Sequence, residues 1–128
     1  MKAILLTMFM GFSFFGLCGQ EAKFKTVDAT EFAKFIENPE VVVLDVRTAE
    51  EHAEGFIPGT HYNIDVLKDN YEQVATETLQ KDKPVALYCR SGNRSKQASE
   101  KLAALGYTNI YEFGGINDWT GETVSENS

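Results

Sequence analysis

From Phe24 onward, the hydrophobic and polar residues follow two alternating patterns. Short stretches with few polar residues and many branched side chains predict strands that are covered on both faces. Longer stretches with apolar residues three and four positions apart predict helices with one buried face. The predicted strands are 24–27, 41–46, 61–64, 85–88 and 109–113.

Residues typical of helix ends separate these strands. Asp28 and Thr48 each precede a glutamate by three positions, which is the spacing of a helix start. Helices are therefore predicted after Asp28, after Thr48 and over 69–79. A fourth helix follows the strand 85–88 and ends at Gly106, and a short closing helix is expected near Trp119.

Strands that alternate with helices predict a parallel sheet with helices on both faces. The chain has 128 residues, which is enough for one domain of ordinary size. We therefore expect a single three-layer α/β domain over residues 21–122. The polar residues 123–128 are expected to form a frayed tail.

The first twenty residues have a different pattern. Lys2 is followed by an uncharged apolar run over 3–17, which is too short for a comfortable membrane span and suits a signal-peptide core. Residues 1–20 are therefore predicted to be a cleaved signal peptide. Cys18 leaves two routes open: a lipoprotein anchored to the membrane through a lipidated Cys18, or ordinary cleavage that releases a periplasmic protein.

Charge and cysteine content exclude several classes of function. The net charge of −7 makes nucleic acid an unfavourable partner, because an acidic domain repels phosphate backbones. Beyond Cys18 only Cys89 remains, so a soluble mature form has no internal disulfide. Two histidines, His52 and His61, make a poor metal site, and we expect neither metal nor cofactor. No partner surface is apparent, and a monomer is expected.

Cys89 immediately follows the predicted buried strand 85–88. Ligands of parallel sheets bind at this end of the strands. Gly92 allows a tight loop whose N–H groups point inward and attract an anion, and the following helix adds its dipole. We expect an exposed loop that favours the Cys89 thiolate, a nucleophile, over a buried structural thiol. The other loop residues are Arg90, Ser91, Asn93 and Arg94.

The loop sequence CRSGNRS, residues 89–95, resembles the active-site loop of rhodanese-type sulfurtransferases. Two flanking stretches agree with this resemblance. LDVR at 44–47, with GFIPG at 55–59, resembles the first signature of that family, and GGINDW at 114–119 resembles its last. The three stretches occur in the family's order.

The resemblance implies a rhodanese-like domain with a five-stranded parallel sheet. Its cysteine takes a sulfane sulfur from an anionic donor such as thiosulfate, becomes a persulfide, and passes the sulfur to cyanide or a thiol. Cys89 would be the persulfide carrier, with residues 90–94 as the cradle and donor-binding groups. Signature positions with mainly structural roles are matched by Asp45, Arg47, Gly114 and Gly115.

Paired charges usually serve structure, so we expect Asp45, Arg47 and Glu51 to form a polar network that supports the fold. The chain departs from the family's pattern at Phe56, where histidine is common. The stretch 59–63 is also one residue longer than usual. Both departures bear on local geometry.

Two other functions fit parts of the pattern. A rhodanese-like domain can serve as a binding module or sulfur carrier without being an enzyme. Protein-tyrosine phosphatases and arsenate reductases use a similar cradle, but their loop has one more residue between cysteine and arginine than the four between Cys89 and Arg94. A smaller ring suits one sulfur atom better than a tetrahedral oxyanion.

Overall fold

The fold is that of a computed structural model, which describes residues 23–126. The predicted signal peptide and Cys18 lie outside these residues. Within them, no helix has both the length and the apolar character needed to cross a lipid bilayer. The elements are β1 (Lys25–Val27), α1 (Ala29–Glu37), β2 (Val42–Asp45), α2 (Ala49–Glu54), β3 (Tyr62–Asn63), α3 (Tyr71–Thr78), β4 (Val85–Tyr88), α4 (Asn93–Ala104), β5 (Ile110–Phe113) and a 3₁₀ helix (Ile116–Asp118).

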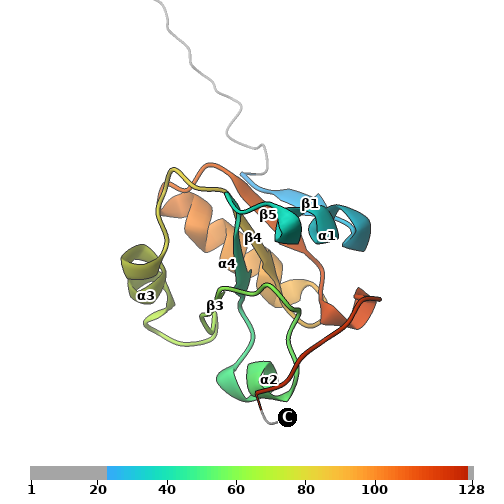
Figure 1. Cartoon of the computed structure of the whole chain (residues 1–128). Coiled ribbons are helices and arrows are strands. Elements are labelled where there is room, and N and C mark those ends of the chain that lie inside the picture. The colour runs from blue at the N-terminus through green and yellow to red at the C-terminus, as the bar shows by residue number, and fades with distance from the viewer. Residues whose placement is uncertain (1–22, 127–128) are drawn as a thin grey trace, which may run out of the picture.

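The strands form one parallel sheet in the order β1-β5-β4-β2-β3 (Figure 1). β4 lies at its centre, and all four of its residues are buried, as its apolar sequence predicts. The five-stranded parallel sheet is thus confirmed. β3 is shorter than the predicted 61–64, although the N–H groups of His61 and Ile64 still donate to carbonyls of β2.

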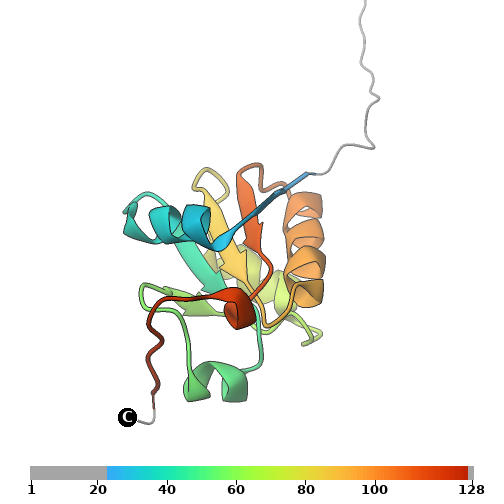
Figure 2. The same ribbon diagram turned by 90° about the vertical axis from the view of Figure 1, so that its right-hand side faces the viewer.

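Helices cover both faces of the sheet, which confirms the three-layer prediction. Figure 2 shows α1 and α4 on opposite sides of the strands. Because neighbouring residues of a strand point to opposite faces, Leu87 packs in the cluster under α3 and α4, whereas Tyr88 packs against Phe32 of α1. Each face therefore has its own apolar core.

Local sequence signals set the starts of α1, α2 and α4. The Asp28 side chain accepts a hydrogen bond from the Glu31 N–H at 2.9 Å. Thr48 and Glu51 cap each other's backbone N–H groups at the start of α2. Gly92 precedes α4 with φ of 117°, a conformation that glycine adopts without strain.

The C-terminal segment differs from the predicted frayed tail. Val124 and Phe56 form an antiparallel bridge, with N–H to carbonyl distances of 2.8 and 2.9 Å. The Glu126 N–H also donates to the Ala53 carbonyl at 3.1 Å. Residues 124–126 therefore lie along the end of α2 and the residues that follow it, because the backbone N–H and carbonyl of Phe56 pair with Val124. Residues 127–128 are outside the described part of the chain.

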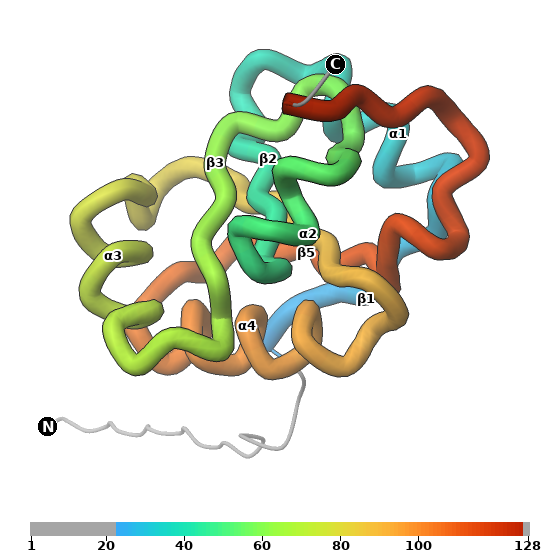
Figure 3. Tube along the Cα trace, turned by 90° about the horizontal axis from the view of Figure 1, so that it is seen from below, coloured from blue at the N-terminus to red at the C-terminus, as the bar shows by residue number. Residues whose placement is uncertain are grey.

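The carboxyl ends of the strands meet at one end of the molecule. Figure 3 views this end, with α2 beside the loop that leads from β4 into α4. A hydrogen bond between Arg94 of α4 and Glu51 of α2 shows that the two segments are in contact. The fold therefore brings all three signature stretches to this end.

Candidate active site

Cys89 directly follows β4, where the backbone turns toward α4. Its Sγ accepts a hydrogen bond from the Gly92 N–H at 2.9 Å and donates to the Gly114 carbonyl at 3.3 Å. The residue is only 1% exposed. The loop is exposed at Arg90, Ser91 and Asn93, as expected. Cys89 itself is buried, because the loop closes over its own sulfur and Gly114 covers another side.

The segment 114–118 packs against this loop and holds its backbone by hydrogen bonds. The Ile116 N–H donates to the Cys89 carbonyl at 2.9 Å, and the Asn117 N–H donates to the Arg90 carbonyl at 3.2 Å. Gly115 packs so closely on Arg90 that a Cβ there would overlap the Arg90 carbonyl. The last signature stretch thus fixes the loop's backbone through direct hydrogen bonds.

The two loop arginines have different environments. Arg94 donates two hydrogen bonds to the Glu51 carboxylate, at 2.7 and 2.9 Å. Arg90 is 64% exposed, and its guanidinium is 3.8 Å from Glu51. Arg94 therefore ties the loop to α2, whereas Arg90 extends toward solvent.

Glu51 is strongly held in its charged form. The hydrogen bond from Arg94 lowers its pKa to about 2; donors from Thr48 act in the same direction, and partial burial opposes them. The same bond raises the pKa of Arg94, although burial opposes it. The ion pair is therefore formed at neutral pH.

Asp45 and Arg47 form a buried pair, as expected. The Arg47 Nε and Nη2 atoms donate to Asp45 at 3.0 and 2.7 Å, and Nη2 also reaches the Gly55 carbonyl at 2.6 Å. Glu51 is not hydrogen-bonded to this pair, because Arg94 holds it. His52 takes that place, with its Nδ1 2.9 Å from Asp45. The pair ties β2 to the end of α2.

Residues 28–122 match the family model described as Rhodanese-like domain. The chain belongs to the rhodanese-like family. A putative sulfurtransferase, YtwF of Bacillus subtilis, is 37% identical over 89 residues, covering 69% of this chain and 82% of that protein. The thiosulfate sulfurtransferase PspE of Escherichia coli is 37% identical over 75 residues, covering 59% of this chain and 70% of that protein.

Solved structures agree with the rhodanese-like fold. The BH2092 protein of Bacillus halodurans superposes with a TM-score of 0.69 at 30% identity, covering 80% of this chain and 77% of that one. A rhodanese-related protein of Thermoplasma volcanium gives 0.65 at 30% identity, covering 78% and 97%. The similarity to both structures extends over most of this rhodanese-like domain.

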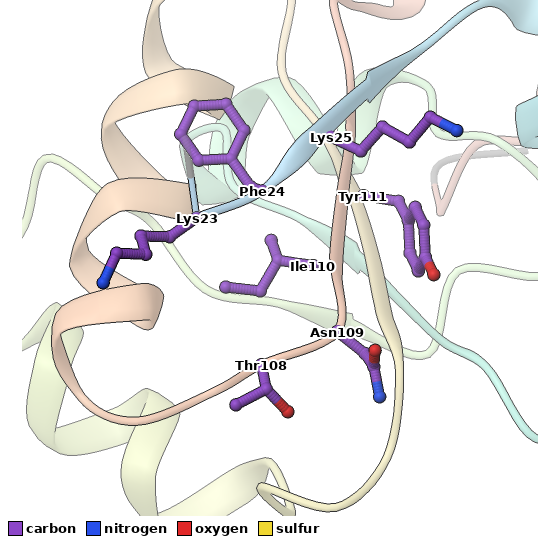
Figure 4. Close-up of a pocket in the computed structure, with 7 residues that line it drawn as sticks. All are labelled: Lys23, Phe24, Lys25, Thr108, Asn109, Ile110 and Tyr111. Carbon is purple, nitrogen blue, oxygen red and sulfur yellow. The ribbon is translucent and has the colours of Figure 1, made fainter. Parts of the chain in front are cut away.

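A surface pocket of this rhodanese-like domain adjoins the Cys89 loop. It is lined by Arg47, Glu51, Glu54, Gly55, Arg90, Ile116 and Asn117. The pocket in Figure 4 is elsewhere: Lys23, Phe24 and Ile110 place it at the amino ends of β1 and β5. Only the first of these two pockets lies beside the predicted site residues.

Sequence reasoning missed one buried polar group beneath the loop. Glu112 of β5 is 0% exposed, and its carboxylate accepts a hydrogen bond from Ser95 in the first turn of α4. An acidic residue within the apolar strand sequence IYEF was the available signal. Its partner could not be identified, because it lies on a separate element.

Proposed function

We propose that this rhodanese-like domain is a sulfurtransferase that carries a sulfane sulfur on Cys89. The observation that carries the proposal is the contact of 2.9 Å between the Gly92 N–H and the Cys89 Sγ, at the start of α4. An N–H donor and a helix N-terminus both favour negative charge on sulfur. The same groups suit a thiolate and the persulfide anion that it becomes.

The proposed reaction has two displacements. In the first, the Cys89 thiolate attacks the outer sulfur of thiosulfate; the sulfur–sulfur bond of the donor breaks, and sulfite leaves with its electron pair. The product is a Cys89 persulfide anion. In the second, cyanide attacks the outer persulfide sulfur, thiocyanate leaves, and the thiolate returns. Both steps balance without a cofactor.

Arg90 is the residue that we assign to the anionic donor. Its guanidinium is mostly exposed and borders the pocket beside the loop. Both terminal nitrogens of the Arg94 guanidinium, Nη1 and Nη2, already donate to Glu51. We therefore assign Arg94 to holding the loop in place. The Escherichia coli relative is named a thiosulfate sulfurtransferase, which supports thiosulfate as the donor to test.

Intact mass spectrometry tests the proposal directly. After thiosulfate treatment, the protein should gain the mass of one sulfur atom, and cyanide should remove it and yield thiocyanate. Cys89→Ser should do neither. Because Cys89 is buried, circular dichroism must confirm that this variant is folded. Thiocyanate formation by the folded serine variant would disprove the assignment of Cys89.

A further inference from the structure

Glu112 is an acidic residue in the otherwise apolar strand β5. It lies opposite Leu87 of β4 on one side and Thr26 of β1 on the other. Its side chain is fully buried. A buried carboxylate is unfavourable unless hydrogen-bond donors replace the water it has lost. The protein keeps one directly beneath the first turn of α4.

Two hydroxyl groups donate hydrogen bonds to this carboxylate, and a lysine forms an ion pair with it. The hydroxyls of Ser95 and Thr26 are each 2.5 Å from it, and the ammonium group of Lys96 is 3.5 Å away. Thr26 approaches from the edge strand β1, whereas Ser95 and Lys96 approach from α4. The carboxylate therefore joins β1, β5 and the start of α4.

The Ser95 hydroxyl links this group to the sulfur. The Gly92 carbonyl is 3.0 Å from the Ser95 oxygen and shares its single hydrogen with the Glu112 carboxylate. Gly92 is the residue whose N–H contacts the Cys89 Sγ. A continuous path therefore runs from Glu112 through Ser95 and Gly92 to Cys89. Thr26 touches the same carboxylate but has no place in this path.

We propose that Glu112 is a positioning residue that holds Ser95, and through it the Gly92 N–H, against the sulfur of Cys89. Its carboxylate fixes the Ser95 oxygen, which keeps the first turn of α4 in register with the loop. The effect on sulfur transfer rests on the function proposed above. The effect on the reactivity of the Cys89 thiol does not.

Ser95→Ala and Thr26→Val form a matched pair, because each removes one hydroxyl from the same carboxylate. Ser95→Ala should slow iodoacetamide alkylation of Cys89 at pH 7 by about tenfold, since one hydrogen bond is worth on that order. It should also lower kcat for thiocyanate formation similarly, with little change in KM. Thr26→Val should leave both within about twofold at a comparable loss of thermal stability.

Substitutions of Glu112 itself complete the test. Glu112→Gln keeps an oxygen that accepts from Ser95 and should lose about threefold in alkylation rate, because neutral hydrogen bonds are weaker. Glu112→Ala should lose about as much as Ser95→Ala. If Glu112→Ala does not fold, the comparison of Ser95→Ala with Thr26→Val decides the matter.

Two results would overturn the proposal. One is equal alkylation rates in folded Ser95→Ala and Thr26→Val. The other is faster alkylation in Glu112→Gln, which would show that the carboxylate acts by its charge and not by position. If wild type forms no thiocyanate, the proposed function fails, but the alkylation comparison still tests the role of Glu112.

Discussion

Gly114 and Gly115 are adjacent in sequence but differ in what surrounds them. A Cβ on Gly115 would overlap the Arg90 carbonyl, and the residue has φ of 155°. A Cβ on Gly114 would meet only the Gly92 Cα, at 4.0 Å. The close approach that holds the Cys89 loop in place is therefore made at Gly115.

We predict that Gly115→Ala is far more damaging than Gly114→Ala. The first should lower the free energy of unfolding by about 3 kcal/mol or more, because backbone must move to admit the methyl group. The second should cost less than about 1 kcal/mol. Urea unfolding of both variants measures the difference, and equal costs would mean that the contact with Arg90 is not rigid.

Single residues show where sequence reasoning succeeded and where it stopped. The positive φ of Gly92 was predictable, because a tight turn between a strand and a helix needs it. The burial of Cys89 was not, because Gly114, which covers its sulfur, is far along the chain. The link from Glu112 to Ser95 escaped prediction for the same reason: it depends on how α4 packs on β5.

At the scale of elements, α2 is joined to the start of α4 by Glu51 and Arg94. The arrangement was only half predictable. The capping spacing correctly placed Glu51 in the first turn of α2. Its pairing with Arg94, and not with Arg47, follows from the packing of α2 beside the loop, which the sequence pattern does not specify.

This ion pair predicts a specific dependence of stability on pH. The folded-state pKa of Glu51 is about 2, below the ordinary 4.5, so the pair stabilises the folded protein fully above about pH 4.5. The stabilisation is lost as the pH falls toward 2. Urea unfolding should show wild type more stable than Glu51→Gln at pH 6, with a smaller gap at pH 3.

Glu50→Gln is the matched control, because Glu50 is the exposed neighbour in the same helix turn. Its stability difference from wild type should stay small at both pH values. A gap between wild type and Glu51→Gln that does not change with pH would contradict the role assigned to the ion pair.

The length of the Cys89 loop should decide which group the site accepts. With four residues between Cys89 and Arg94, its ring should favour sulfur over a phosphate with three equatorial oxygens. Inserting one glycine after Gly92 should reduce persulfide formation by about a hundredfold, since a misplacement of about 1 Å costs that much. Wild type should hydrolyse p-nitrophenyl phosphate no faster than Cys89→Ser.

Thiocyanate formation and p-nitrophenyl phosphate hydrolysis should both be measured on wild type and on the glycine-insertion variant, with Cys89→Ser as the background. Phosphate ester cleavage through Cys89 in wild type, without thiocyanate formation, would favour the phosphatase alternative.

At the scale of the whole molecule, the C-terminal segment closes over the region after α2. Val124 pairs with Phe56, whose ring stacks on His52 at 4.2 Å between centroids. His52 in turn contacts Asp45, in the buried pair beside the site. At this position, where histidine is common in the family, Phe56 packs between His52 of α2 and the C-terminal segment.

We predict that ending the chain after Glu122 lowers stability without abolishing the fold. The truncation removes the two backbone hydrogen bonds between Val124 and Phe56 and the one from Glu126 to Ala53, each worth about 1 kcal/mol. The melting temperature should fall by several degrees, while thiocyanate formation per folded molecule is kept. An unchanged melting temperature would mean that residues 123–128 contribute nothing to stability.

The order of the strands also places the two shortest ones at the margins of the sheet. β1 has three residues and β3 has two, whereas the interior strands have four each. An edge strand presents unpaired backbone groups that another extended chain can pair with, and a short edge strand presents few of them. The strand that leads into Cys89, β4, is the third from either edge of the sheet. At high protein concentration, the sheet edges therefore offer other copies of the chain few backbone groups to pair with, which disfavours aggregation.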